Sequence, residues 1–392
     1  MAKPKLALIP ATQGSKLYSV LPADGVGDFD FSRGSAATRI NKDGLIETVA
    51  SGVSRLNYPL IDGVVNGCPS HLLEPQSTNI ALRSQELGTS PWVLSGGAVT
   101  NNYAISPDGT LNANKIESIS GNVGGVYQTL TSLVAGDIYT VSFYGKSGTS
   151  ANLCLTINNT AAWNTVGGKE FTSADGLNNS TWTRFEYTFA VPSTSGFNIH
   201  IGSHSEIGLT SQYLGDFYVY GVQAEKLAYK TSYIPTTTSA VTRVAETANG
   251  AGDASTFNDS EGVLMAEISA QEISNASSRR TISLSDGTND NRVYISFDDE
   301  YNKLNIFIIV GTTQIFTSNV NISNQNSFNK ITVKYKSGDS SIYVNGFLVD
   351  SFSNTFSGGN FNTLKFSNRG SGELFYGNTK QIQYFDSALN DS

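Results

Sequence analysis

Several residue types are scarce in this chain of 392 residues, which has two cysteines, two methionines and three histidines. Two cysteines cannot build a disulfide framework, and we expect Cys68 and Cys154 to be separate thiols in different domains. Three histidines leave little for serine–histidine chemistry, and no G-x-S-x-G, H-E-x-x-H or phosphate-cradling glycine motif occurs. The sequence predicts that the protein is not an enzyme. The sequence leaves open the alternative of a glycosidase, in which the fold would bring two catalytic carboxylates together.

Charge and long apolar runs are also in short supply. Only 15% of the residues are charged, the net charge is −8, and the isoelectric point is near 5.0. An acidic chain lacks the basic face that phosphate binding needs, so we expect no nucleic acid partner. No run of about 18 apolar residues occurs, which predicts no membrane insertion. The start, MAKPKLALIP, lacks the apolar core and cleavage site of a secretory signal.

Glycine is abundant, at 38 residues, and short runs of aromatic and β-branched residues recur between turns. Polar and apolar residues alternate in Ile138–Tyr144 and again in Thr181–Phe189, the period of two that indicates strands. The same spacing of strands and turns returns between residues 262 and 385. The sequence therefore predicts an all-β protein with two antiparallel β-sandwiches.

We divide the chain into three units. Residues 1–78 form an irregular segment of short extended pieces, with a hairpin across Asn41–Gly44. This segment has little core of its own, so it should be ordered by packing on a neighbouring domain or another subunit. Residues 79–245 form the first sandwich and end in the strand Phe217–Val222, after which Tyr233–Ser239 is an extended tether around Pro235. Residues 246–392 form the second sandwich.

Several strings carry resemblances to known families. The strings YGVQAE, TSYIPTT and VYQTLTSLVAGDIYTVSFYGKSG resemble the jelly-roll, carbohydrate-binding-module-like domain of tailed-phage virion proteins. The stretch KLYSVLPADGVGDFDFSRGSAATRINKDGLIETV, with LLEPQSTN, resembles an N-terminal region of phage tail and head-fibre proteins. FNKITVKYKSGDSSIYVNGFLVDSF resembles a concanavalin A or laminin-G-like sandwich.

These resemblances imply a non-enzymatic bacteriophage virion protein: a head fibre, a capsid decoration protein or a tail fibre. Such a protein is made in the host cytoplasm and exposed on the particle surface. Its N-terminal segment would attach it to other virion proteins, and its sandwiches would bind host-surface glycans weakly and multivalently. Fibre symmetry favours a homotrimer. Two alternatives stay open: a phage polysaccharide depolymerase, and a binding module of a secreted bacterial polysaccharide-degrading enzyme.

The candidate glycan site centres on Trp163, which lies in a polar loop where its ring could stack on a sugar face. The alternative is that Trp163 folds back over the edge of the sandwich. The candidate polar partners lie on neighbouring strands: Gln128, Asn152, Thr156 and Asn158. Trp182 is expected to be a packing residue, whereas Tyr144 could face the core or the surface.

The jelly-roll resemblance also implies a structural calcium ion, held by Asp216 before the closing strand and by Glu86. The alternative is that Asp216 is a solvated loop acid. Calcium needs six to eight oxygen ligands, and the sequence offers only these two side chains. His200 and His204 would lie about 13 Å apart on one strand, so we expect no shared metal there.

Overall fold

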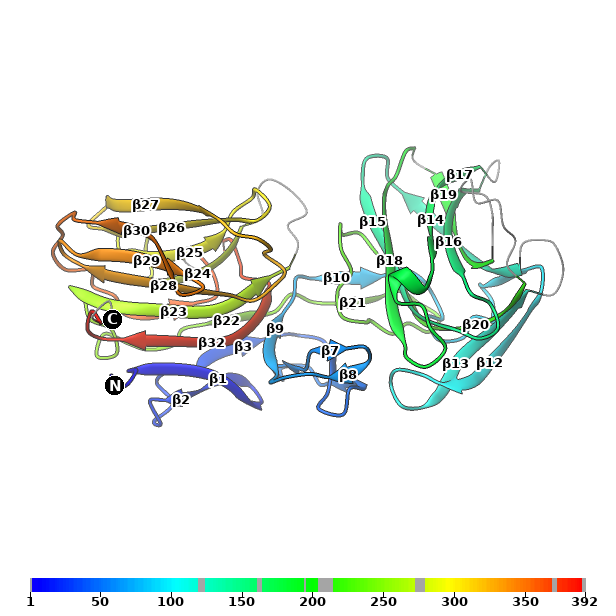
Figure 1. Cartoon of the computed structure of the whole chain (residues 1–392), viewed down its shortest axis with the longest axis horizontal. Coiled ribbons are helices and arrows are strands. Elements are labelled where there is room, and N and C mark those ends of the chain that lie inside the picture. Colours follow the sequence, from blue (N-terminus) through cyan, green and yellow to red (C-terminus); the bar gives the residue numbers. More distant parts are fainter. Residues whose placement is uncertain are drawn as a thin grey trace.

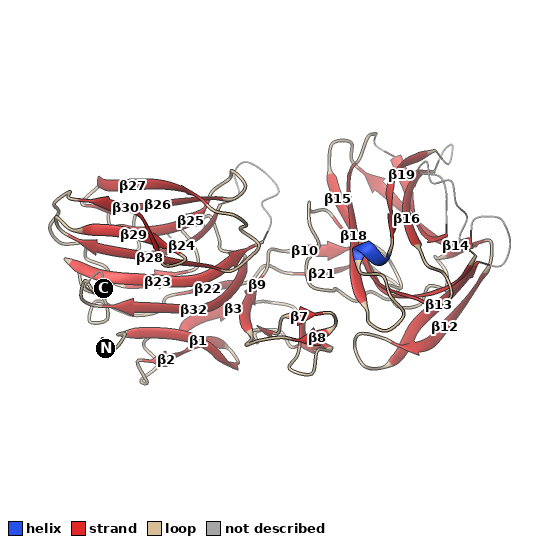
Figure 2. Cartoon of the chain, in the orientation of Figure 1, coloured by secondary structure: helices blue, strands red, loops and turns tan. Residues whose placement is uncertain are grey.

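The computed structural model describes residues 2–118, 124–160, 164–193, 195–203, 214–271, 279–368 and 372–389. These ranges consist of strands and loops, with one short 3-10 helix at Ser173–Asp175 (Figure 2). The predicted all-β fold with antiparallel sandwiches is confirmed. None of the helical structure described is long and apolar enough to cross a membrane. Figure 1 shows the two sandwiches at opposite ends of the long axis, with the β7–β8 hairpin below and between them.

The first sandwich has two five-stranded antiparallel sheets. The first sheet has the order β11 (Val93–Ser95), β14 (Gly124–Leu133), β19 (Ser195–Ser203), β16 (Leu153–Asn159), β17 (Thr165–Phe171). The second has the order β12 (Ala98–Ile105), β13 (Leu111–Ser118), β20 (Gly215–Glu225), β15 (Ile138–Ser147), β18 (Thr183–Ala190). Alternate residues of β15, namely Tyr139, Val141 and Phe143, enter a core shared by both sheets. The alternation seen in the sequence is therefore the packing pattern of the sandwich.

The second sandwich pairs a five-stranded sheet with an 11-stranded one. The smaller has the order β27 (Thr313–Asn321), β26 (Lys303–Val310), β25 (Arg292–Phe297), β24 (Arg280–Ser285), β31 (Thr363–Lys365). The larger runs through β22 (Thr247–Asn249), β3 (Phe29–Ser32), β2 (Lys16–Leu21), β1 (Leu6–Gln13), β32 (Gly377–Phe385), β23 (Glu261–Ala270), β28 (Asn329–Lys336), β29 (Ser340–Val344) and β30 (Phe347–Phe352), with β6 (Leu56–Asn57) and β9 (Ser70–Leu73) attached. The predicted turn between β29 and β30 is present, and Asn345 and Gly346 both have positive φ.

The N-terminal segment belongs to the larger sheet. Strand β1 pairs with β32, so that Leu6 lies opposite Tyr384, although the two residues come from opposite ends of the chain. Leu6, Leu8 and Phe29 are fully buried in the core of the second sandwich. The segment expected to need a neighbour thus obtains its order from residues 246–392, whose core it completes.

Shorter ladders fill the space between the sandwiches. They are β4 (Ala37–Ile40) with β5 (Ile46–Val49), β7 (Leu60–Ile61) with β8 (Val64–Val65), and β10 (Ser77–Asn79) with β21 (Val241–Arg243). The β4–β5 ladder confirms the hairpin predicted across Asn41–Gly44. The stretch expected to be an extended tether is packed at its start, because the Tyr233 ring is buried and its hydroxyl lies 2.6 Å from the Ser84 hydroxyl.

A buried chain of alternating charges ties these parts together. Its order is Arg33, Glu246, Arg55, Glu74, Arg243, and all five side chains are almost fully buried. The backbone N–H of Ser232 also donates to Glu74, over 2.7 Å. The network therefore joins the N-terminal segment to both the end of the jelly roll and the start of the second sandwich.

Candidate functional site: a polar face of the jelly roll

One sheet of the jelly roll carries polar side chains on the face turned away from the core. In β19, Phe197, Ile199 and Ile201 enter the core, so Asn198 and His200 point to the opposite side. Strand β16 follows the same rule, with Leu155 and Ile157 inside and with Thr156 and Asn158 outside. We call the outer side of β14, β19, β16 and β17 the polar face.

The strand register aligns these side chains in rows across three strands. Thr129 of β14 lies opposite Asn198, and Asn198 lies opposite Asn158. In the next row Tyr127 lies opposite His200, which lies opposite Thr156. The Thr129 hydroxyl donates to the Asn198 side-chain oxygen over 2.7 Å, which fixes the orientation of that amide. The rows place hydroxyl, amide, imidazole and phenol groups side by side.

Glycines make room for the His200 ring. A Cβ atom on Gly125 or on Gly202 would lie 2.9 Å from His200 Cε1, closer than a carbon contact allows. The Cβ of Gly125 would also lie 2.4 Å from the Ile201 carbonyl oxygen of the neighbouring strand. Both positions therefore need glycine, because any larger residue would collide with the His200 ring and with the neighbouring backbone.

The polar face has a buried centre and accessible margins. Asn158, Asn198, His200 and Thr156 are all less than 5% exposed, whereas Thr129 at the margin is exposed. The Thr156 hydroxyl has no hydrogen-bond partner in the part of the chain that the structure describes. Leaving a buried hydroxyl unpaired costs about 1–3 kcal/mol. Such a group is a candidate for contact with a ligand, because folding has not used it.

The predicted glycan residues divide between this face and other places. Thr156 and Asn158 lie on it, in adjacent rows. Gln128 does not: it is buried, and its amide donates to the Leu82 carbonyl (2.9 Å) and accepts from the Leu82 N–H (2.7 Å), so it holds the chain at the edge of the sandwich. The Asn152 side-chain amide donates a hydrogen bond to the Glu170 carboxylate. Trp163 lies outside the described residues, and its contact with a sugar stays a prediction.

Asn198 and His200 were not among the residues predicted for the site. The sequence suggested His200 only as a metal ligand with His204, which lies outside the described residues. The signal was present in the string Phe197-Asn198-Ile199-His200-Ile201, whose strict alternation places both polar side chains on one face.

The two carboxylates expected to hold calcium have separate partners. Asp216 accepts from the Thr149 N–H over 2.7 Å, and the Lys115 ammonium lies 3.3 Å from its second oxygen. Burial raises the pKa of Asp216, but Thr149 and Lys115 outweigh this, so the pKa lies below its ordinary value. Glu86 pairs with Arg83. An ammonium group beside Asp216 does not fit a calcium site, and the described residues contain no cluster of three or more His, Cys, Asp or Glu able to hold a metal.

No protein-family model matches the chain, and no curated protein is significantly similar to it. Among solved structures, the CBM40 module of the Ruminococcus gnavus IT-sialidase, bound to α2,3-sialyllactose, has 15% identity and a TM-score of 0.29 over 36% of this chain and 83% of that one. The enzymatically active domain of bacteriophage CBA120 tailspike protein 4 has 17% identity and a TM-score of 0.28, over 37% and 21%. The Caenorhabditis elegans galectin LEC-6 has 15% identity and a TM-score of 0.24, over 32% and 83%.

Proposed function

We propose that the protein is a non-enzymatic glycan-binding protein and that the polar face of the jelly roll is its binding surface. The observation that carries this proposal is the register that aligns Thr129, Asn198 and Asn158 in one row and Tyr127, His200 and Thr156 in the next. Sugar hydroxyls both donate and accept, and amide, hydroxyl and imidazole groups match them in either role. A tyrosine ring at the margin adds apolar surface for a sugar face.

The wider role that we propose is that of a bacteriophage virion protein, as a head fibre, a capsid decoration protein or a tail fibre. The support is the resemblance of residues 16–80 and 220–243 to phage fibre proteins, together with the acidic, weakly charged composition. Weak sites gain avidity when several copies are joined, which favours a homo-oligomer, and we expect a trimer. Antibody-labelled electron microscopy of virions tests the location, and light scattering tests the trimer. Particles without label would contradict the virion role.

Binding to a glycan array tests the proposed surface. We expect the wild-type protein to bind a subset of glycans, and Thr156→Val and Asn198→Ala each to weaken binding at least about tenfold. The matched control is Thr188→Val, at an exposed threonine of β18 in the opposite sheet, whose hydroxyl is hydrogen-bonded to Thr140 and to the Ala228 carbonyl. If all three variants bind as the wild type does, the polar face is not the binding surface.

A second measurement addresses the absence of catalysis. The protein is incubated with host polysaccharide, and reducing ends are counted over time. We expect no release above the buffer control. Steady release would favour the depolymerase alternative and would identify a pair of carboxylates to be sought by substitution.

A further inference from the structure

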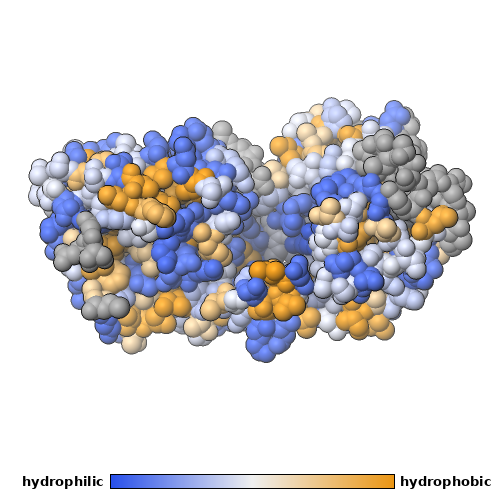
Figure 3. Space-filling view, viewed as in Figure 1, coloured by the Kyte–Doolittle hydropathy of each residue, from blue (hydrophilic) through white to orange (hydrophobic). Residues whose placement is uncertain are grey.

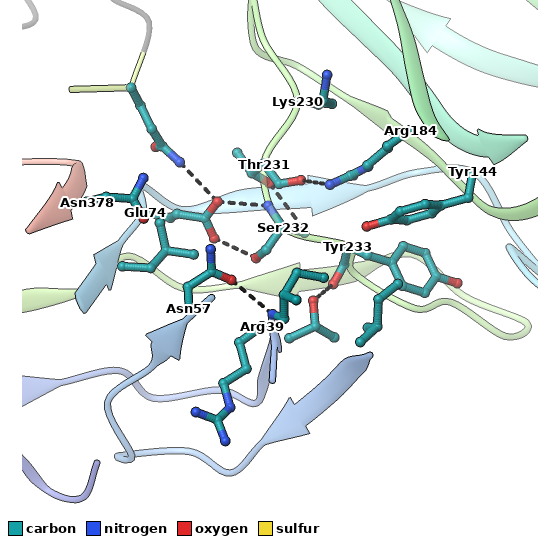
Figure 4. A pocket seen from close by; sticks show the side chains of 15 residues that line it. Arg39, Asn57, Glu74, Tyr144, Arg184, Lys230, Thr231, Ser232, Tyr233 and Asn378 are labelled. Atoms are coloured by element: carbon teal, nitrogen blue, oxygen red, sulfur yellow. Dashed lines mark hydrogen bonds between the residues drawn. The ribbon is translucent and has the colours of Figure 1, made fainter. Parts of the chain in front are cut away.

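A cavity lies where the N-terminal segment, the jelly roll and the second sandwich meet. Its volume is about 360 Å³, and its lining includes Asn57 from β6, Tyr144 and Arg184 from the jelly roll, and Asn378 from β32 (Figure 4). A second cavity of about 470 Å³ shares Asn57, Tyr144 and Arg184 with the first, so the two adjoin. We call the pair the junction cavity. It lies on the opposite sheet of the jelly roll from the polar face.

Arg184 brings an unbalanced charge to this cavity. Its guanidinium donates to the Thr231 carbonyl over 2.6 Å and to the Ser142 hydroxyl over 3.1 Å, and lies 5.3 Å from the centre of the Tyr144 ring. None of these partners is anionic. Among the described residues, its buried Nε–H has no acceptor and its guanidinium has no carboxylate partner.

The other charges of the lining are paired, except for Asp62 of the β7–β8 hairpin, an exposed carboxylate at the second cavity with no ion pair among the described residues. Arg39 lies 2.8 Å from Glu47, and Lys230 lies 2.6 Å from Glu186. Glu74 is held by Arg55 and Arg243 of the buried network. In the lining of the first cavity, Arg184 is thus the one charge without a counter-ion among the described residues, and in a chain whose net charge is −8 this favours an anionic group there.

Aromatic rings and amides complete the lining. Tyr58 and Trp182 line the second cavity together with Asn178. Trp182, expected to be a packing residue, is half-buried and packs against a small core that includes Tyr220 and Tyr233. Its indole N–H donates to the Ile105 carbonyl over 3.0 Å, and the Lys146 ammonium lies 5.2 Å from the centre of its ring. One wall comes from the β7–β8 hairpin, whose apolar surface is visible in the lower middle of Figure 3. Flat apolar rings beside amide groups suit sugar rings better than they suit a small inorganic anion.

We propose that the junction cavity is a second binding site, and that it takes a carboxylate-bearing oligosaccharide whose carboxylate pairs with Arg184 while its sugar rings lie against Tyr144, Tyr58 and Trp182. The site is distinct from the polar face in position and in ligand class. A ligand here contacts all three parts of the chain, so binding would also stabilise their arrangement.

The test is isothermal titration calorimetry of the full chain with short oligogalacturonates, and with the same oligomers after their carboxylates have been reduced to alcohols. We expect the acidic oligomers to bind at least about tenfold more tightly than the reduced ones. Arg184→Gln should abolish this preference. Arg83→Gln, a change of the same type at the exposed Arg83–Glu86 pair, should leave it unchanged.

A second variant keeps the proposal testable if the Arg184→Gln protein does not fold. Asn57→Asp keeps the side-chain oxygen that accepts the Ile40 N–H over 2.9 Å, but adds a negative charge to the cavity wall. This variant should weaken the binding of the acidic oligomers at least about tenfold and leave the affinity for the reduced oligomers unchanged. Thr156→Val on the polar face should change neither the affinity for the acidic oligomers nor that for the reduced ones. The proposal is overturned if the acidic oligomers bind no better than the reduced ones, if Asn57→Asp leaves their affinity unchanged, or if Thr156→Val removes it.

Discussion

Arg55 and Glu246 form a two-point ion pair in which both side chains are fully buried, although 191 residues separate them. The Arg55 Nε–H donates to Glu246 Oε1 over 2.9 Å, and its Nη2 reaches the second oxygen. The same guanidinium lies 2.9 Å from Glu74. Its Nη1 also donates to the Ser232 hydroxyl over 2.8 Å, so one arginine contacts the N-terminal segment, the end of the jelly roll and the start of the second sandwich.

Replacing Arg55 should destabilise the whole chain. Arg55→Met leaves Glu246 and Glu74 buried with less compensating charge, and breaking a buried pair in this way costs about 3–5 kcal/mol. The free energy of unfolding from guanidinium denaturation measures the effect. The control is Lys42→Gln, because Lys42 and Asp43 form an exposed pair whose loss should change stability little. Similar effects of the two variants would mean that the network does not hold the parts together.

The same network predicts that stability depends on acid pH. Burial raises the pKa of Glu74, but Arg243, Arg55 and Ser232 outweigh this, so the pKa lies well below the ordinary 4.5. A lowered folded-state pKa contributes stability above the unfolded value, and this contribution is lost as the pH falls below it. We expect the free energy of unfolding to fall below about pH 4.5, and to fall less steeply in Glu74→Gln, which is already destabilised at pH 7. Parallel pH curves for the two proteins would contradict the assignment to Glu74.

Local patterns in the sequence were enough to predict the strands and the two sandwiches, because alternation and turn residues act over a few positions. The partner of residues 1–36 could not be predicted in this way. Leu6 opposite Tyr384 is a contact between the ends of the chain, and nothing in either string specifies the other. Only part of the polar face could be predicted, for a different reason: the sequence suggests Thr156 and Asn158 as polar residues of one strand, but it does not show that Asn198 lies beside them. Strand order, which the sequence does not reveal, makes them neighbours.

Strand β1 gives a direct test of this long-range pairing. Residues 246–392 alone lack β1 and the buried Leu6, Leu8 and Phe29, so β32 would have an unpaired edge and the core would be open to water. We expect this fragment to aggregate or to show no cooperative thermal transition by circular dichroism. Residues 1–78 fused to residues 246–392 through a flexible linker should melt cooperatively. A cooperative, soluble fragment without residues 1–78 would show that β1 is dispensable.

Replacing Thr156 tests whether its buried hydroxyl serves ligand binding or folding. Its hydroxyl is buried and unpaired among the described residues, so Thr156→Val should raise the free energy of unfolding by about 1 kcal/mol. Thr140→Val is the matched control, because the Thr140 hydroxyl is also buried but donates to the Leu227 carbonyl over 2.9 Å. That variant should lose stability.

Denaturation curves and glycan binding are then measured on the same protein samples. A Thr156→Val protein that is more stable and binds glycans more weakly would show that the hydroxyl is retained for its ligand at a cost in stability. A gain in stability with unchanged binding would mean that Thr156 only packs, and the binding surface would have to be sought around Trp163. A loss of stability would mean that the hydroxyl has a structural partner, and the polar face would lose its strongest sign of a ligand.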